Sequence, residues 1–334
     1  MSYSLAIEIG GVNTSIYKKN QGLVLKEPSL VCASSFGEDQ YEIKAIGTNA
    51  EKLQGKTNEL TYIFSPIVCG EVKSVEYTAE MLKYFLDKIE LRKFPKENVV
   101  FVVPAGISED CKDEIRKVAK ISGLGKVAFL PAVVASAHAT GLPVQHSKTI
   151  IVVHVGGTLT DISAINMNSI LKGASIDLGG RYLDVEIAQY ISKKHKIEIS
   201  IASAKRVKEK IATLIEGDWR TTEIVGIDEN TGKPKQIIVS SEEILPILTQ
   251  FMENIIVGIE TTINICPPEI SNDIATDGIF LSGGLCEIGG LEKYLSKKLQ
   301  IKVNVLPDAG DASILMAGKL LENKKLLADI IQNF

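Results

Sequence analysis

Two short segments of this chain repeat the same pattern about one domain's length apart. Residues 5–16 read LAIEIGGVNTSI and residues 151–162 read IVVHVGGTLTDI. Each is an apolar strand with one polar residue inside it, followed by two glycines and a second strand that carries a threonine. Paired glycines allow the tight turn that such a hairpin needs. The repeat therefore predicts two related domains, each of which opens with a strand–turn–strand hairpin.

The rest of the chain alternates short β-branched runs with amphipathic helical patterns, which indicates an α/β fold with at least partly parallel sheets. The predicted buried strands are Leu5–Ile9, Val99–Val103, Thr149–Val155 and Gly278–Leu281. The predicted helices are Tyr77–Ile89, Ser108–Ile121, Tyr182–His195, Ala204–Ile215, Ser241–Ile265, Gly290–Leu299 and Asp311–Leu320. Ser108 is expected to cap the second of these helices, and Ser240 with Glu243 to form a capping box on the fifth.

Composition excludes several classes of protein. The net charge is -4 and the pI about 5.8, so no basic excess exists to neutralise a phosphate backbone, and we expect no nucleic-acid partner. Five scattered cysteines without a C-x-x-C pair argue against a disulfide framework or a zinc site and fit a reducing cytoplasm. No charged segment followed by an apolar one opens the sequence, so we expect no signal peptide. No run of about 18 apolar residues predicts a membrane span.

The paired hairpins indicate a site for an anion. Exposed N–H groups in a glycine turn form a concave anion site, and two hairpins facing each other across a cleft could clamp a triphosphate. The hydroxyl of Thr14 or Thr160 could donate to phosphate oxygens. A third glycine-rich segment reads LSGGLCEIGG and places Gly283 and Gly284 at the end of a predicted strand, where open α/β sheets bind ligands.

Several segments, taken in order, resemble the actin superfamily, which includes actin, heat-shock chaperone ATPases, sugar kinases and the bacterial MreB proteins. The resemblance is closest to MreB and covers nearly the whole chain. It is carried by Glu8–Val31, Ser65–Leu86, Val102–Gly123, Gly141–Val144 and Ser175–Ile191. It implies an actin-like α/β fold in which two related domains, each with a mixed sheet flanked by helices, surround a nucleotide cleft.

The resemblance also implies domain limits and site residues. One domain would comprise residues 1–145 plus 310–334, with a smaller subdomain at about 31–66. The other would comprise residues 146–309, with a smaller subdomain at about 181–244. The residues expected to contact ATP or ADP are Gly10, Gly11, Asn13, Thr14, Gly156, Gly157, Thr160, Gly179, Gly180, Lys208, Glu209, Gly283 and Gly284.

The acidic residues of the superfamily's motifs are largely replaced in this chain. Glu8 stands where the first phosphate loop normally has Asp, and His154 stands where the second has Asp. Ala132 occupies the place of the glutamate that positions the attacking water, and Arg181 replaces a further Asp. Since phosphoryl transfer depends on a metal ion and a positioned nucleophile, we expect weak or absent ATP hydrolysis and doubtful Mg²⁺ binding, with no metal site.

Nucleotide binding is a separate question. Arg181, and His154 if it is protonated, could supply part of the positive charge that Mg²⁺ would bring to a phosphate. His154 could equally be a neutral histidine within an apolar strand. A third hypothesis is that Glu8 and His154 pair with each other across the cleft and form a metal-free structural site.

The resemblance implies a cytoskeletal filament subunit that organises cell shape or wall synthesis, self-assembling and possibly assembling with a paralogous MreB. It implies a cytoplasmic location, possibly at the inner face of the membrane, with Leu91 and Phe94 of a basic loop as possible membrane contacts. The C-terminal apolar stripe around Leu327 and Ile330 is expected to pack on its own domain or on a partner. The alternatives are an active, nucleotide-switched ATPase of the chaperone or sugar-kinase branch and a plasmid-segregating actin relative.

Overall fold

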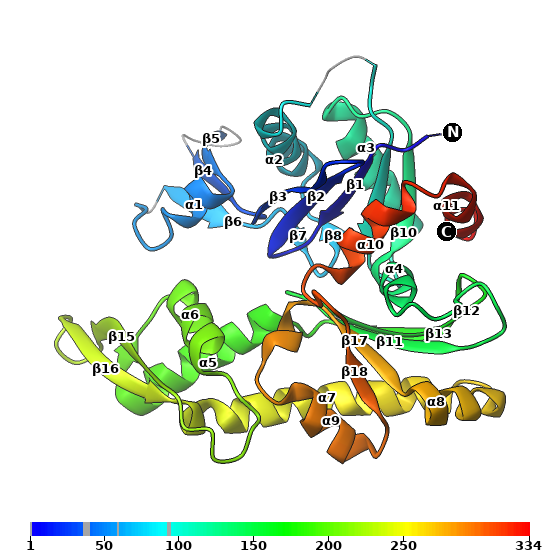
Figure 1. The fold of residues 1–334 in the computed structure, drawn as a ribbon. Coiled ribbons are helices and arrows are strands. Elements are labelled where there is room, and N and C mark those ends of the chain that lie inside the picture. Colours follow the sequence, from blue (N-terminus) through cyan, green and yellow to red (C-terminus); the bar gives the residue numbers. More distant parts are fainter. Residues whose placement is uncertain (1, 36–40, 59, 92–94) are drawn as a thin grey trace.

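Two five-stranded sheets with the same connections organise the fold in the computed structural model, which describes residues 2–35, 41–58, 60–91 and 95–334. The strand orders are β3-β2-β1-β9-β10 and β13-β12-β11-β17-β18. In each sheet the central strand is antiparallel to the next strand of its hairpin and parallel to its other neighbour. The hairpin registers also agree, because Glu8 lies opposite Ser15 and His154 opposite Asp161. The predicted pair of related domains is therefore confirmed (Figure 1).

We call the elements around the first sheet the first lobe. Its main strands are β1 (Leu5–Ile9), β2 (Asn13–Lys18), β3 (Gly22–Pro28), β9 (Val99–Val103) and β10 (Val127–Pro131). A small sheet holds β4 (Val31–Ser35), β5 (Tyr41–Ile46) and β6 (Thr61–Phe64), and β7 (Ile67–Val68) pairs with β8 (Glu71–Val72). The helices are α1 (Thr48–Glu51), α2 (Val75–Lys88), α3 (Glu109–Ile121), α4 (Ala132–Ala139), α10 (Ala312–Leu320) and α11 (Lys324–Ile331).

The second lobe surrounds the second sheet. Its main strands are β11 (Ile150–Val155), β12 (Thr160–Asn166), β13 (Ser169–Ile176), β17 (Ile279–Ser282) and β18 (Val303–Val305). A small sheet holds β14 (Ile197–Glu198), β15 (Thr221–Asp228) and β16 (Pro234–Ser240). The α-helices are α5 (Gly180–His195), α6 (Ile201–Ile211), α7 (Ser241–Asn264), α8 (Ser271–Asp277) and α9 (Leu291–Leu299), and short 3₁₀ turns span Pro268–Ile270 and Gly284–Glu287.

The apolar core explains how the two lobes are held together. One buried cluster fills the second lobe, and another lies between the first sheet and helices α2 and α3. A third cluster joins the lobes, because buried residues of α4 and α10 pack with Ala6 and Val100 of the first sheet and with Val152 of the second. The helices α4 and α10 thus lie between the two sheets and set how the lobes face each other (Figure 1).

Most predicted elements are present with small shifts at their ends. The largest shift is in α6, which was expected at Ala204–Ile215 but begins at Ile201, after the Ser200 cap, and ends at Ile211. It stops because Thr213 forms a bridge with Gly289. Helix α4 was not predicted; it is buried nearly all round, so its sequence lacks the one-sided apolar stripe that identifies a surface helix.

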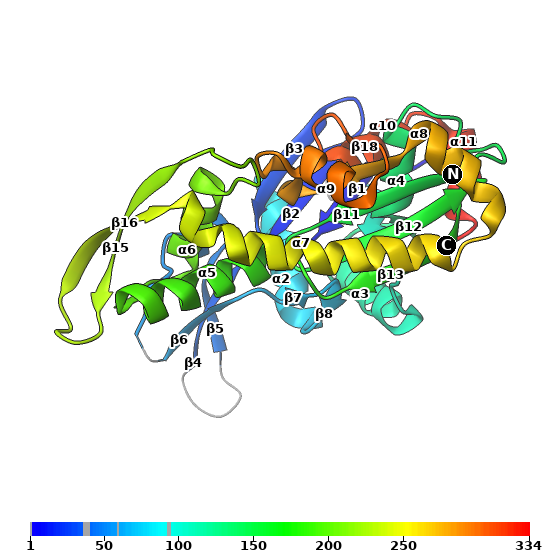
Figure 2. The same cartoon turned by 90° about the horizontal axis from the view of Figure 1, so that it is seen from below.

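Helix α7 runs the length of the second lobe (Figure 2). Among the described residues it is the one helix long and apolar enough to cross a membrane by length and composition, although the sequence alone had suggested none. Its buried face, which includes Leu248, Phe251 and Ile255, packs into the core of the second lobe. These contacts are those of a core helix.

The predicted capping box of α7 is confirmed and extended. The Ser240 hydroxyl accepts from the backbone N–H of Glu243, and the Glu243 carboxylate accepts from the backbone N–H of Ser240. The same carboxylate lies 2.8 Å from both the Lys194 ammonium and the His195 ring, which belong to the last turn of α5. Despite partial burial, these donors lower the pKa of Glu243 to about 2. His195 is therefore bonded to a carboxylate, although it lies in the Lys-rich last turn of α5.

We expect Glu243→Gln to destabilise the protein by roughly 3 kcal/mol at neutral pH. This is the free energy that corresponds to lowering the pKa of Glu243 from 4.5 to about 2. Because the folded pKa is depressed, this stabilisation is present above pH 4.5 and is lost as pH falls toward 2. Urea unfolding at pH 7 and at pH 3 measures it, and the difference between variant and wild type should shrink at the lower pH. Glu242→Gln, at the exposed neighbour, is the control; an equal effect of the two substitutions would contradict the account.

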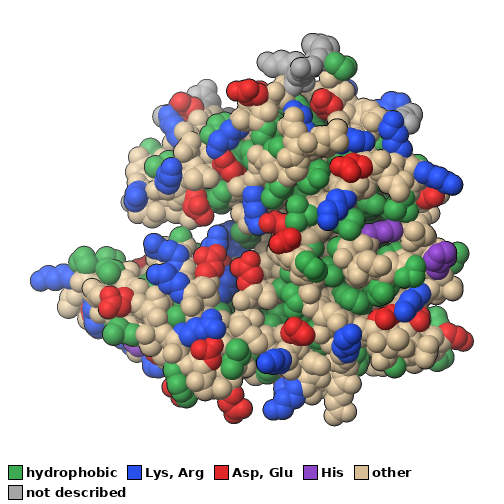
Figure 3. All heavy atoms as spheres, viewed as in Figure 1, with side chains coloured by type: hydrophobic (Ala, Val, Ile, Leu, Met, Phe, Trp, Pro, Cys, Tyr) green, Lys and Arg blue, Asp and Glu red, His purple; other side chains and the backbone are tan. Residues whose placement is uncertain are grey.

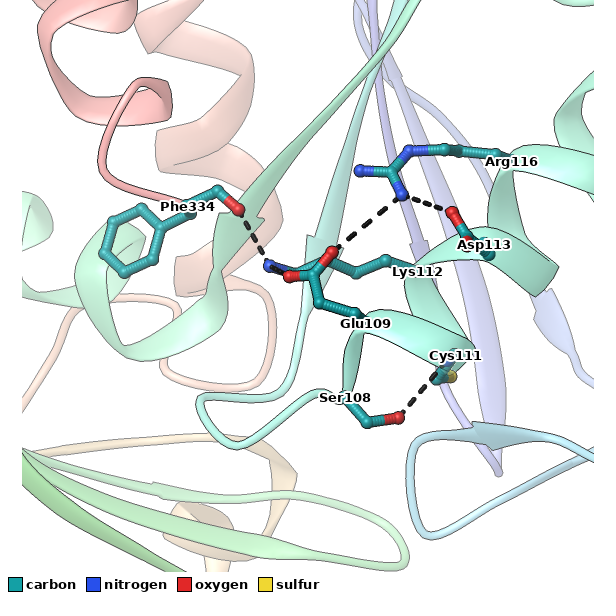
Figure 4. A network of polar contacts seen from close by, with 7 residues as sticks. All are labelled: Ser108, Glu109, Cys111, Lys112, Asp113, Arg116 and Phe334. Atoms are coloured by element: carbon teal, nitrogen blue, oxygen red, sulfur yellow. Dashed lines mark hydrogen bonds and ion pairs between the residues drawn. The ribbon is translucent and has the colours of Figure 1, made fainter.

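The C-terminal helix packs on its own lobe, as expected. Leu327 and Ile330 are buried in the cluster that joins the lobes. Figure 4 shows a further tie, in which the buried Lys112 of α3 donates to the backbone carbonyl of Phe334 at 2.7 Å. Lys112 also pairs with Glu109, while Arg116 on the next turn pairs with Asp113.

Candidate functional site

The two glycine hairpins meet face to face at the bottom of a cleft between the lobes. A Cβ on Gly11 would lie 2.7 Å from the Thr158 side chain, and one on Gly157 would lie 2.5 Å from the Val12 side chain. Glycine is therefore required at both positions, because each hairpin tip packs onto the other. The N–H groups of Gly11 and Gly157 donate no backbone hydrogen bond within the described part of the chain, which leaves them available to an anion.

Two connected cavities open from this point. The inner cavity, of about 290 Å³, lies between the hairpins, the start of α5 and the turn after β17. The outer cavity, of about 490 Å³, lies between α1 of the first lobe and α6 of the second. Figure 3 shows the corresponding notch on the left of the molecule, with charged side chains along both edges.

Ten of the thirteen residues predicted to contact nucleotide line the inner cavity. They are Gly10, Gly11, Asn13, Gly156, Gly157, Gly180, Lys208, Glu209, Gly283 and Gly284. The structure thus brings together segments that are distant in the sequence and joins them into one concave wall.

The other three predicted contact residues do not line the inner cavity. Thr14 and Thr160 are fully buried, and their hydroxyls bond to the Ser29 hydroxyl at 2.8 Å and to the Leu178 carbonyl at 2.7 Å. These hydroxyls hold each hairpin to a neighbouring segment of the same lobe. The expected role of Thr14 and Thr160 as donors to phosphate does not fit this geometry. Gly179 packs against the backbone of the second hairpin, where a Cβ would lie 2.6 Å from Gly157.

The turn after β17 contains two glycines with different surroundings. Gly283 has a φ of 95°, and a Cβ there would lie 2.6 Å from the carbonyl carbon of Val155 and overlap its oxygen. Its N–H donates to the Ala309 carbonyl at 2.7 Å. Gly284 has no atom within 4 Å of an added Cβ and borders the inner cavity. The first glycine fixes the turn, and the second keeps space open.

Glu8, Ala132 and His154, the residues expected to replace the family's acids, lie with Asp161 around a small adjoining cavity of about 80 Å³. The hypothesis of a direct Glu8–His154 pair is wrong for this structure, since no ion pair joins them among the described residues. Each instead bonds to a hydroxyl: Ser313 donates to Glu8 at 2.9 Å, and the His154 ring lies 3.0 Å from the Ser282 hydroxyl. Both hydroxyls come from distant segments, which the sequence could not reveal.

Burial at this end of the cleft favours the uncharged forms of Glu8 and His154. Burial raises the pKa of Glu8, against the opposing effects of His154 and the Ser313 hydroxyl. Burial lowers the pKa of His154, against the effect of Glu8. A carboxyl that resists ionisation and an imidazole are poor ligands for a hard cation such as Mg²⁺. Within the described residues, no group of three or more His, Cys, Asp or Glu side chains could hold a metal ion.

Sequence reasoning missed Asp161, which lies beside Ala132 in the small cavity. Its carboxylate accepts from the backbone N–H of Ala105 in the first lobe at 3.1 Å and from the Ser175 hydroxyl. Burial raises the pKa of Asp161, and these two hydrogen bonds oppose the rise. The carboxylate therefore ties the lobes together beneath the hairpins. Its place directly after Thr160 in the repeated segment was the available signal.

Comparison with known proteins identifies the family of this chain. A sequence profile described as MreB/Mbl protein matches residues 2–329. The chain belongs to the MreB/Mbl family. The cell shape-determining protein MreB of Escherichia coli is 30% identical over 325 residues, covering 96% of this chain and 94% of that protein.

Solved structures of relatives show the same actin-like fold. MreB5 of Spiroplasma citri bound to ADP superposes with a TM-score of 0.89 at 26% identity, over 99% of this chain and 98% of that one. A second structure of that MreB5 contains AMPPNP. The MamK double helical filament matches with a TM-score of 0.78 at 20% identity, covering 95% of this chain and 98% of that one, which supports the fold alone.

Proposed function

We propose that this MreB/Mbl family member is a cytoskeletal filament subunit that organises cell shape or wall synthesis and whose cleft binds ADP or ATP with little or no hydrolysis. The observation that carries the proposal is the inner cavity, where two glycine hairpins present free N–H groups. The sequence resemblance adds that Ala132 and His154, which line the adjoining cavity, replace catalytic acids. The cradle suits phosphate, and its surroundings do not suit metal-assisted attack by water.

Relatives support each part of the proposal. E. coli MreB is named a cell shape-determining protein, and MreB5 of S. citri has been solved with ADP and with AMPPNP. The MamK double helical filament shows that a protein of this fold can assemble into a filament. Head-to-tail contacts that do not close into a ring generate such filaments. The partner we propose is therefore a second copy of this chain or a paralogous MreB.

A cytoplasmic location, which includes the inner face of the membrane, is part of the proposal. Leu91 packs partly against the core of the first lobe, which fits a loop anchor better than a free membrane contact. Phe94 lies outside the described residues. The domain limits given above, 1–145 with 310–334 and 146–309, likewise stay part of the proposal.

Sedimentation with electron microscopy tests the filament proposal. We expect the purified protein to form sedimenting filaments with ATP and Mg²⁺, with ADP and Mg²⁺, and to similar extent with AMPPNP, because assembly would not require hydrolysis. Filaments with ATP and Mg²⁺ alone would favour the nucleotide-switched ATPase instead. No filaments under any of these conditions, or in the presence of a paralogous MreB, would contradict the proposal.

A further inference from the structure

The cations that line the inner cavity differ in whether a carboxylate neutralises them. Lys26 lies 2.8 Å from Asp311, and Lys208 lies 2.6 Å from Asp184. Lys205 lies 3.9 Å from Glu51 across the notch and 3.8 Å from Glu209. The remaining cation of this wall, Arg181, forms no ion pair with any side chain that the structure describes.

Arg181 is held in a fixed place by its backbone. It lies in the first turn of α5, where its N–H donates to the Gly157 carbonyl at 2.8 Å and the N–H of Gly180 donates to the Gly156 carbonyl at 3.0 Å. These bonds join the helix start to the second hairpin. The Arg181 side chain is exposed and borders both the inner and the outer cavity. Arg181 thus lies beside the glycine cradle.

A nucleotide bound in the cleft needs positive charge to balance its phosphates. A nucleoside diphosphate or triphosphate carries several negative charges that must be balanced when it leaves water. Beside the cradle, His154 presents an imidazole nitrogen, whereas Mg²⁺ prefers oxygen ligands. Among the described residues, no group of three or more His, Cys, Asp or Glu side chains could hold a metal ion. A guanidinium group matches phosphate oxygens with two parallel hydrogen bonds and always carries its charge.

We propose that the cleft binds a nucleoside diphosphate or triphosphate without a divalent cation, and that Arg181 supplies the positive charge by pairing with its phosphates. This inference rests on the proposed function insofar as that function assumes a nucleotide in the inner cavity. It goes further by assigning the counter-charge to a side chain of this protein.

Calorimetric titration of the purified protein with ADP, in excess EDTA and in excess MgCl₂, tests the inference. The two dissociation constants of the wild type should agree within about threefold. Arg181→Gln should weaken binding about 10- to 100-fold in both buffers, the range expected when a charge-assisted hydrogen bond is lost. Arg181→Lys should fall between the two, because it keeps the charge and loses the paired geometry.

Arg116→Gln is the matched control, since it removes an equal charge from α3, outside the residues that line the cavities. Binding that needs Mg²⁺ would overturn the inference while leaving a nucleotide-bound filament subunit intact. Metal-independent binding that Arg181→Gln leaves unchanged would overturn the role of Arg181. If ADP fails to bind in either buffer, the inference is wrong, and sedimentation without nucleotide then decides the filament proposal separately.

Discussion

Gly283→Ala is expected to destabilise the protein by about 3–4 kcal/mol, the sum of a left-handed backbone penalty and an overpacked contact. At a φ of 95°, an added methyl would overlap the backbone of Val155 at the end of β11. Neither strand can move aside without breaking the parallel pairing of β11 with β17. Urea unfolding at neutral pH measures the loss.

The control for this prediction is Gly284→Ala, one residue along the same turn. Its added methyl meets no atom within 4 Å, and Gly284 is not among the glycines of positive φ, so we expect a change below about 1 kcal/mol. Equal stability losses in the two variants would show that the turn tolerates a side chain at Gly283, contrary to the geometry described.

Gly284→Phe is expected to abolish nucleotide binding without unfolding the protein. Gly284 borders the inner cavity of about 290 Å³, and open space surrounds the position of its missing Cβ. A phenyl ring at this position is expected to extend into the cavity. We expect ADP affinity to fall by more than about 100-fold, corresponding to a loss beyond about 2.7 kcal/mol, as measured by calorimetric titration.

Two controls separate a blocked cavity from other causes of lost binding. The free energy of unfolding without nucleotide should stay within about 1 kcal/mol of the wild type, which separates a blocked cavity from a damaged fold. Gly284→Ala should retain most of the affinity, because a methyl group fills little of the cavity. Near-normal ADP binding by the Phe variant would mean that nucleotide binds elsewhere or not at all.

The hairpins could be predicted from the sequence because their signal is local. Two glycines after an apolar strand specify a turn wherever they occur, and their repetition specified two domains of one topology. The predicted contact residues that depend only on the turn, such as Gly11 and Gly157, consequently line the inner cavity.

The errors arise where local sequence does not determine the direction or partner of a side chain. Asn13 and Thr14 are adjacent in a strand, so they point to opposite faces, and the cavity receives Asn13 while Thr14 is buried. The hypothesis that Glu8 pairs with His154 failed because the partner that Glu8 uses, Ser313, is about 300 residues away in the sequence. Helix α4 was missed because burial on all sides removes its periodicity.

We propose that this MreB/Mbl protein assembles without depending on ATP hydrolysis. Following inorganic phosphate release and light scattering together during assembly in ATP and Mg²⁺ tests this. We expect scattering to rise while phosphate release stays at the background of uncatalysed hydrolysis. Release of about one phosphate for each assembled subunit would contradict it, and would mean that the site still catalyses the reaction despite Ala132 and His154.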